Sequence, residues 1–390
     1  MPQRWFDAHL DLAYLAVRGR DMVRAASDLS PERVGPHAPA AVTLPELRTA
    51  HVDLALGTIF TEPVKQADTV EAVLIATLTA EQYSTGDVEQ AHRRGRAQLE
   101  AYLTWRDAGL VALNLRSALV APEGVGEVRG GMGVAEVVPP SIESRVLRAA
   151  KSSPLTLGIL IENADVVREP AELAWWAERG VVAVGLAWAK PSRYAMGNGA
   201  APESRAGLTD LGREMVREMD RLGIAHDASH LCDRALDELL ELATGTVMAS
   251  HSNCRALLDR AGAPPNQRHL TDRHIRAIIA RGGVVGLNLF SPFLIAPGSS
   301  RSGAGEARAT LEEAADHVLR ICELAGNASH VGLGSDMDGG FSAQRLPLGM
   351  SGPKHLKLLA DTLTKRGMTQ ADLESFAWKN WSELFARERK

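Results

Sequence analysis

The chain has 390 residues, of which 45% are hydrophobic and 23% charged, so it can bury a large core and is not expected to be disordered. Its formal net charge of −5 argues against a general binder of nucleic acids or anionic membranes, because both usually need a basic surface. The three cysteines, Cys232, Cys254 and Cys322, are scattered, which argues against a disulfide framework or a thiolate zinc site. The first residues do not resemble a secretory signal, and no apolar run reaches the roughly 18 residues that cross a bilayer, so we expect a soluble cytoplasmic protein.

A short apolar run followed by an amphipathic segment recurs along the chain. The apolar runs are too short for helices, are rich in Val, Ile, Leu or Gly and lie between turn residues, so each predicts a strand. In chain order these strands are Arg4–His9, Val52–Phe60, Leu155–Ile161, Val181–Ala187, Ile224–Ala228, Thr246–Ala249, Gly283–Leu289 and Val331–Gly334. Strands that alternate with helices indicate a parallel sheet covered on both faces. Eight of them predict an α/β fold, a (β/α)₈ TIM barrel that forms a single domain over residues 1–390.

Two segments leave the strand count open. The stretch Ala67–Trp105 is typical of one or two helices, and Leu110–Leu115 is typical of an accessory strand or a buried turn. A ninth strand there would argue against closure, so a doubly wound open sheet is the alternative to the barrel.

Four connections that follow strands are unusually long and rich in Gly, Pro and Ser. They span Ser30–Pro45, Pro191–Gly207, Ser291–Ala309 and Gly339–Pro353. All four would emerge at the carboxyl ends of the strands, where barrels place their chemistry. Loops of this length usually form the walls or lid of a site, although surface insertions without function are the alternative.

Metal-ligand residue types recur at the carboxyl ends of the predicted strands: His9, Asp11, Glu162, His230 and His251. Residues two apart on a strand point to the same side, so His9 and Asp11 can reach one ion together. Imidazole and carboxylate groups suit zinc or a similar divalent ion, and a bridging carboxylate can hold two ions about 3.5–4 Å apart. The sequence therefore predicts a barrel of the metal-dependent hydrolase type.

Other catalytic motifs are absent from the sequence. It contains no P-loop, no dinucleotide-binding GxGxxG and no HExxH, and the end of the last strand is not the GxSxG of a serine hydrolase. Ser229, Ser250 and Ser335 are expected to be packing or hydrogen-bond partners rather than nucleophiles. His226 would share a strand face with His230, so we expect it to point into the barrel as a buried, hydrogen-bonded residue.

Several segments, spread in order from the first residues to about residue 340, carry a family resemblance. They are Asp7–Leu12, Gly207–Val216, Met219–Gly223, Asp227–His230, Ser250–Asn253, Arg268–Asp272, Gly282–Asn288 and Val331–Gly339. On these segments the chain resembles the renal, or membrane, dipeptidase family of the amidohydrolase superfamily.

The resemblance implies a dinuclear centre in which His9 and Asp11 hold one zinc ion, His230 and His251 hold the other, and Glu162 bridges them. Other divalent metals are compatible with the same ligands. The implied activity is hydrolysis of the peptide bond of small dipeptides by metal-activated hydroxide, and the implied assembly is a homodimer.

The same resemblance assigns the remaining site residues. Asp336 resembles the aspartate that handles the proton of the attacking water, and Arg268 resembles the arginine that grips the substrate's terminal carboxylate. Trp188 stands where the family has a histidine that helps to polarise the scissile carbonyl. Loss of one such donor commonly costs on the order of 10²–10³ in rate. We therefore expect Trp188 to contact the substrate in a changed pocket.

Two alternatives to a dipeptidase follow from that departure. One is a related amidohydrolase that acts on another small amide, such as an N-acyl amino acid or a cyclic amide, which Trp188 favours. The other is a catalytically silent metal-binding homologue, against which the retained Asp336 argues.

Overall fold

Eight parallel strands form the central sheet, as the sequence predicts. The computed structural model describes residues 3–65, 78–119, 127–129, 136–138, 141–146, 155–259, 265–296 and 307–387. Around the sheet the strand order is β10 (Val247–Met248), β9 (Ala225–Asp227), β8 (Val181–Gly185), β7 (Thr156–Ile161), β2 (Val52–Ile59), β1 (Trp5–Leu10), β12 (Val331–Leu333) and β11 (Val285–Leu287).

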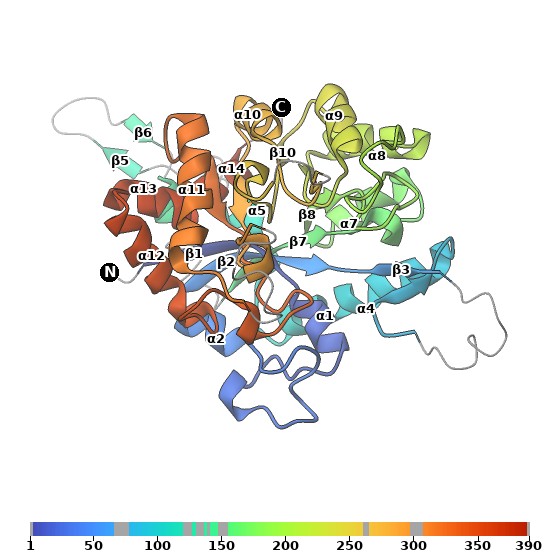
Figure 1. Ribbon diagram of the computed structural model, residues 1–390. Helices are drawn as coiled ribbons and strands as arrows, with labels where there is room; N and C mark the ends of the chain where they lie inside the picture. Colours follow the sequence, from blue (N-terminus) through green and yellow to red (C-terminus); the bar gives the residue numbers. More distant parts are fainter. Residues whose placement is uncertain are drawn as a thin grey trace.

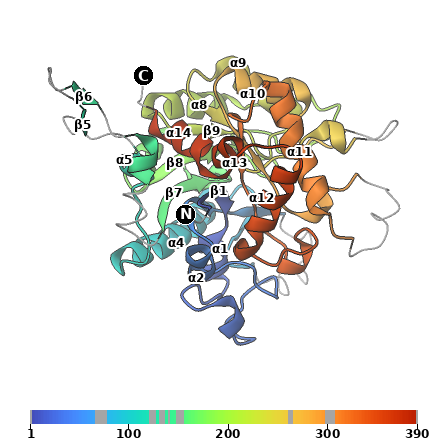
Figure 2. The ribbon, with the colours of Figure 1, turned by 90° about the vertical axis from the view of Figure 1, so that its left-hand side faces the viewer.

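A parallel bridge between Ala249 and Val285 joins the two ends of the sheet. The amide of Ala249 donates to the Val284 carbonyl at 3.0 Å, and the amide of Gly286 donates to the Ala249 carbonyl at 2.8 Å. The strands therefore close into a barrel, and the open-sheet alternative is wrong. Figures 1 and 2 show the strands at the centre of the molecule with the helices arranged around them.

Helices fill the connections between strands. They are α1 (Leu12–Val17), α2 (Leu44–Thr49), α4 (Val88–Asp107), α5 (Leu115–Leu119), α7 (Leu173–Ala177), α8 (Asp210–Leu222), α9 (Asp233–Leu242), α10 (Asp272–Ala280), α11 (Leu311–Ala325), α12 (Leu356–Lys365), α13 (Gln370–Glu374) and α14 (Asn380–Ala386). Short helical turns are η1 (Ala26–Asp28), η2 (Ala164–Val166), η3 (Pro170–Glu172), η4 (Arg255–Leu257), η5 (Ser291–Phe293), η6 (Ala343–Arg345), η7 (Pro353–His355) and η8 (Ser375–Lys379). Within the described ranges no helix is both long and apolar enough to pass through a bilayer.

The two segments that left the strand count open are now assigned. Ala112 makes a single parallel bridge to Thr156, so Leu110–Leu115 lies beside β7 without adding a ninth strand. Residues 66–77 of the predicted helical stretch lie outside the described residues. Of the rest, 82–84 form the short strand β4 (Gln82–Ser84), which pairs with β3 (Glu62–Val64), and the helix begins only at Val88. A further pair, β5 (Glu127–Arg129) and β6 (Glu136–Val138), is antiparallel.

Helix α8 shows why these segments form where they do. The Thr209 hydroxyl accepts a hydrogen bond from the Gly212 amide at 3.0 Å, which caps the first turn. Gly223 ends the helix at φ 62°, a left-handed conformation that glycine adopts without a steric penalty. Between these ends Met215 and Met219 are fully buried, so one helix face packs onto the barrel.

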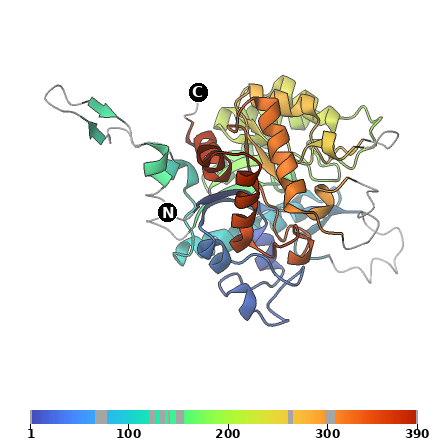
Figure 3. The same ribbon diagram turned by 60° about the vertical axis from the view of Figure 1, so that its left-hand side comes forward.

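The last helix packs against the last strand. Trp381 of α14 is fully buried, and its indole nitrogen donates to the Leu333 carbonyl at 3.0 Å. A Cβ atom on Gly332 would lie 2.2 Å from that nitrogen, so the ring can approach β12 only because residue 332 is glycine. Figure 3 shows α11 and α12 side by side on the outside of the barrel, next to this region.

Candidate metal centre

The five candidate metal ligands converge at the carboxyl end of the barrel. His9 lies within β1, Asp11 follows that strand, and Glu162 directly follows β7. His230 and His251 lie in the turns that follow β9 and β10. All five side chains are buried, and they come from positions up to 242 residues apart in the chain (251 − 9). The parallel strands therefore bring together residues that are scattered in sequence.

Glu162 is the centre of the cluster. Its Oε1 atom lies 3.7 Å from Nε2 of His9, 3.1 Å from Nε2 of His230 and 3.6 Å from Nε2 of His251. Nε2 of His9 also lies 3.8 Å from Oδ1 of Asp11. One carboxylate oxygen thus faces three imidazoles, so Glu162 lies close enough to share a metal ion with any of them.

Asp336 joins the same cluster from the end of β12. Its Oδ1 atom lies 3.9 Å from Nε2 of His9, and its Oδ2 atom accepts a hydrogen bond of 2.8 Å from the side-chain amide of Asn288. Both Asp336 (φ 58°) and His230 (φ 66°) have left-handed backbone conformations. Such conformations are unfavourable for non-glycine residues and are concentrated at functional sites.

Polar partners that the sequence analysis did not identify orient these side chains. The hydroxyl of Thr58 donates to Asp11, and Oδ1 of Asn198 lies 3.1 Å from Nδ1 of His230. Thr58 could have been suspected, because it stands near the end of β2. Nothing in the sequence marks Asn198, which lies in a long loop and depends on how that loop folds.

The electrostatics of the cluster favour a bound cation. Burial, reinforced by the nearby charge of Arg268, lowers the pKa values of His9, His230 and His251, so these imidazoles are neutral at neutral pH. Burial raises the pKa of Glu162 well above its usual range, and the charges of neighbouring carboxylates add to the effect. Neutral imidazoles are the form that binds metal, and divalent cations would relieve the repulsion between buried carboxylates.

The carboxylates beside Glu162 behave in the same way. Burial raises the pKa of Asp11 to about 6, although its hydrogen bond from Thr58 opposes the shift. Burial and the charge of Asp11 raise the pKa of Asp336 well above its usual range. Among the described residues, Nε2 of His9 is a buried nitrogen without a hydrogen-bond partner, as expected of an atom that awaits a metal. The donor set therefore fits one or two divalent ions.

A small aromatic pocket of 140 Å³ lies above this cluster. Trp188 lines it, with its ring centroid 5.3 Å from Phe60 and 6.0 Å from His230. Its other aromatic residues are Phe290, Phe293 and Phe341. Sequence analysis identified Trp188 but none of the phenylalanines, because an isolated phenylalanine in a loop gives no sign of the surface that it faces.

Arg268 also lines the pocket and is buried. Its two terminal nitrogens donate to the His251 carbonyl at 2.9 Å and to the Ser252 hydroxyl at 3.3 Å. The guanidinium carbon lies 5.1 Å from the ring centroid of Phe293. The positively charged guanidinium of Arg268 is thus held in place between the aromatic walls of the pocket and the candidate metal ligands.

The long loops predicted from the sequence contribute to the site. Asn198, from the loop after β8, contacts His230, and Phe293 and Phe341 belong to the loops after β11 and β12. In the loop after α1, the amides of residues 41 and 42 each donate to Oδ2 of Asp338 at 2.8 Å. These loops are therefore walls and supports of the site, although residues 297–306 lie outside the described part of the chain.

A closed (β/α)₈ barrel with histidines and carboxylates at the carboxyl ends of its strands is the architecture of a metal-dependent hydrolase. Residues 142–388 match the membrane dipeptidase family, peptidase family M19. Because this match covers well over half of the chain, the protein belongs to that family, which confirms the predicted class of metal-dependent dipeptidase. Glu162, His230, His251, Arg268 and Asp336 lie inside the matched region, whereas His9 and Asp11 lie before it.

Individual relatives agree with this classification. An uncharacterized protein from the pqqA 5′ region of Klebsiella pneumoniae is 32% identical over 217 residues, which cover 55% of this chain and 74% of that protein. Dipeptidase tcpJ of Claviceps purpurea is 33% identical over 160 residues, which cover 41% of this chain and 34% of that protein. The chain thus spans about a third of the length of that relative.

Two solved structures share the fold over 99% of both chains. One is the metallopeptidase dipeptidase AC, with a TM-score of 0.74 and 21% identity. The other is a metallopeptidase from Rhodobacter sphaeroides bound to a phosphinate mimic of the dipeptide L-Ala-D-Ala, with a TM-score of 0.73 and 21% identity.

Proposed function

We propose that this protein is a dinuclear zinc dipeptidase that hydrolyses the peptide bond of small dipeptides. The observation that carries the proposal is the position of Glu162, one oxygen of which lies within 3.7 Å of Nε2 atoms from three histidines. In this proposal His9 and Asp11 hold one ion, His230 and His251 hold the other, and Glu162 bridges them. Bound zinc ions would supply Lewis acidity and a water molecule of lowered pKa.

Asp336 is the proton carrier in this scheme. Its buried carboxylate is anchored through Oδ2 to Asn288, which leaves Oδ1 on the side of the metal ligands. A carboxylate whose pKa is raised by burial can accept the proton of the attacking water and then deliver it to the leaving amine. Asp336 therefore acts as general base and then as general acid.

Arg268 binds the terminal carboxylate of the substrate. Its guanidinium is buried and held by the His251 carbonyl and the Ser252 hydroxyl, so the charge stays fixed before substrate arrives. Its Nε atom is buried without a hydrogen-bond partner in the described part of the chain. A planar donor in this state suits a carboxylate. The dipeptide mimic bound by the Rhodobacter sphaeroides relative supports this substrate class.

The pocket also favours a second candidate function. Trp188 offers a large apolar face beside His230, and the pocket has a volume of only 140 Å³. An N-acyl amino acid or a cyclic amide would present the same amide and an apolar group to these walls. We therefore keep hydrolysis of another small amide as the alternative activity.

The test combines metal content with turnover. Two zinc ions per chain and cleavage of dipeptides, abolished in Asp336→Asn, are the expected results. Zinc binding with turnover only of N-acyl amino acids or cyclic amides would favour the alternative. A protein that binds no zinc after reconstitution would contradict both.

A further inference from the structure

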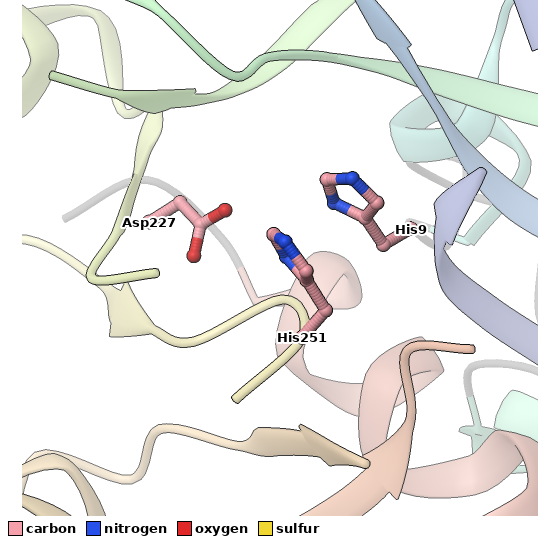
Figure 4. A group of neighbouring side chains, drawn as sticks. All are labelled: His9, Asp227 and His251. Atoms are coloured by element: carbon pink, nitrogen blue, oxygen red, sulfur yellow. The ribbon is translucent and has the colours of Figure 1, made fainter. Parts of the chain in front are cut away.

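A second group of metal-ligand residue types lies behind the proposed metal centre. His9, Asp227 and His251 are buried, and each offers an atom within 4.8 Å of the others. Figure 4 shows the three side chains turned toward one another, with His251 between Asp227 and His9. Residue type alone would suggest a third ion site here.

The hydroxyl of Ser250 already occupies the space between these groups. Its Oγ atom lies 2.6 Å from Oδ2 of Asp227, 2.7 Å from Nδ1 of His251 and 3.2 Å from Nδ1 of His9. A longer contact of 3.4 Å reaches the hydroxyl of Ser229. A serine oxygen therefore fills the space between the three side chains.

We propose that Asp227 and Ser250 are positioning residues that hold His9 and His251 in the tautomer whose Nε2 atoms carry the lone pair that binds metal. The proposal rests on the dinuclear centre proposed above, and it assigns a role to two residues that are not themselves metal ligands. Its basis is a count of protons and lone pairs around the serine oxygen.

The carboxylate of Asp227 is an acceptor at both oxygens. Oδ1 of this carboxylate accepts hydrogen bonds from the backbone amides of Ser229 at 3.0 Å and Ser250 at 2.8 Å. A carboxylate can only accept, so the bond at Oδ2 must use the single proton of the Ser250 hydroxyl. The serine oxygen is then left with two lone pairs and no proton for the imidazoles.

Both imidazoles must therefore donate to the serine. Nδ1 of His251 and Nδ1 of His9 each carry a proton, and the lone pair of each ring lies on Nε2. These are the atoms that face Glu162, at 3.6 Å and 3.7 Å. One serine thus directs two histidines toward the proposed metal positions.

The two histidines belong to different ions in the proposed centre, His9 to one and His251 to the other. Removing the serine hydroxyl should therefore weaken the binding of both ions and not of one alone. Loss of an interaction that orients a metal ligand typically costs 10–100-fold in metal affinity. We expect Ser250→Ala to lower the affinity for both zinc ions by about that factor.

Asp227→Asn provides a sharper test, because it keeps the size of the side chain and reverses one hydrogen bond. The two backbone amides require an acceptor at the Oδ1 position, so the asparagine oxygen must stay there. The amide NH₂ then faces Ser250 and donates to it. The serine proton must turn toward an imidazole Nδ1, which imposes the tautomer with a proton on Nε2. Asp227→Asn should therefore weaken zinc binding more than Ser250→Ala does.

The experiment measures zinc affinity by chelator competition in the full-length wild-type protein, in both variants and in Ser382→Ala. Ser382 is a fully buried control serine on α14 whose hydroxyl donates to the Trp378 carbonyl at 2.8 Å, so its loss should leave zinc affinity unchanged. A second measurement follows the tautomers directly in zinc-free protein labelled with ¹⁵N-histidine, by long-range proton–nitrogen NMR at pH 8. The wild type should show protonated Nδ1 on both rings, and in Asp227→Asn one of the two rings should shift toward protonated Nε2.

The outcomes separate this inference from the proposed function. If the wild type binds two zinc ions and Ser250→Ala and Asp227→Asn bind them equally well, the positioning role is wrong and the metal centre stands. If the wild type binds no zinc, the proposed function is wrong, and the NMR measurement alone decides whether Ser250 and Asp227 set the tautomers. Unchanged tautomers in Asp227→Asn would overturn the proposal even if Ser250→Ala fails to fold.

Discussion

Replacing Arg268 by lysine would test whether this residue recognises substrate directly. The change keeps a positive charge but removes the planar pair of terminal nitrogens, which hold the His251 carbonyl at 2.9 Å and the Ser252 hydroxyl at 3.3 Å. Lysine has a single nitrogen at the end of a flexible chain, so it cannot hold both partners and a substrate carboxylate in the same geometry. We expect a loss of substrate recognition.

The size of the effect follows from the bonds that are lost. A hydrogen bond that involves a charged group contributes about 1.5–3 kcal/mol, and removing part of a buried charged contact costs about 2–5 kcal/mol. Because Arg268 is buried, solvent cannot replace the lost bonds. A loss of about 2–4 kcal/mol in transition-state binding corresponds to a fall of roughly 30- to 900-fold in kcat/KM.

The assay compares a dipeptide with the same dipeptide carrying a C-terminal amide, for the wild type and Arg268→Lys. If Arg268 binds the carboxylate, Arg268→Lys should lower kcat/KM strongly for the free dipeptide and only slightly for the dipeptide amide. Equal losses on both substrates would show that Arg268 acts only by supporting His251, and would refute the reasoning. Arg273→Lys, at an exposed position on α10, is the matched control and should behave as the wild type.

The remaining predictions concern stability. Removing divalent metal should lower Tm, because the repulsion between the buried Asp11 and Glu162 carboxylates is then uncompensated. Adding zinc at 100 times its Kd should raise the free energy of unfolding by about 2.7 kcal/mol. An unchanged Tm would contradict a metal centre. Gly332→Ala should cost about 1–3 kcal/mol by forcing Trp381 away from β12, measured by calorimetry, and a wild-type Tm would show that the helix can shift freely. Burial lowers the pKa of His317 from 6.5 to about 4. The unfolded chain therefore binds the proton first, and stability falls between pH 6.5 and 4 by up to about 3 kcal/mol. In His317→Gln the free energy of unfolding should fall less over that pH range than in the wild type. An identical dependence of stability on pH in both proteins would argue against a lowered pKa of His317.

The sequence predicted the barrel because the fold depends on a repeated local pattern. Each of the eight strands is a short apolar run, and the sheet contains all eight. The same logic located His9, Glu162 and His251, since a polar residue that follows a buried strand must leave the core at its end. The apolar pattern alone left an open sheet as the alternative, because closure depends on the Ala249–Val285 bridge between two separate strands.

The alternation of side chains failed at β9 for a physical reason. We expected His226 to point into the barrel, because it lies an even number of residues from His230. His226 is buried and hydrogen-bonded as predicted, but at 2.7 Å from Asp220 of α8, while Asp227 contacts Ser250 near the metal ligands. The strand ends at Asp227 and His230 is left-handed at φ 66°, so the two-residue period does not extend through the turn.

The strand order has a consequence for synthesis on the ribosome. β1 is made first, but one of its two neighbours is β12, which ends at Leu333. At about 5–20 residues per second, roughly 20–60 s separate the emergence of these two strands. During that interval one edge of β1 has no partner strand, and the other proposed metal ligands, Glu162, His230 and His251, are translated well after His9 and Asp11. Chaperones or early contacts that shield this edge would therefore protect the nascent chain from edge-to-edge pairing.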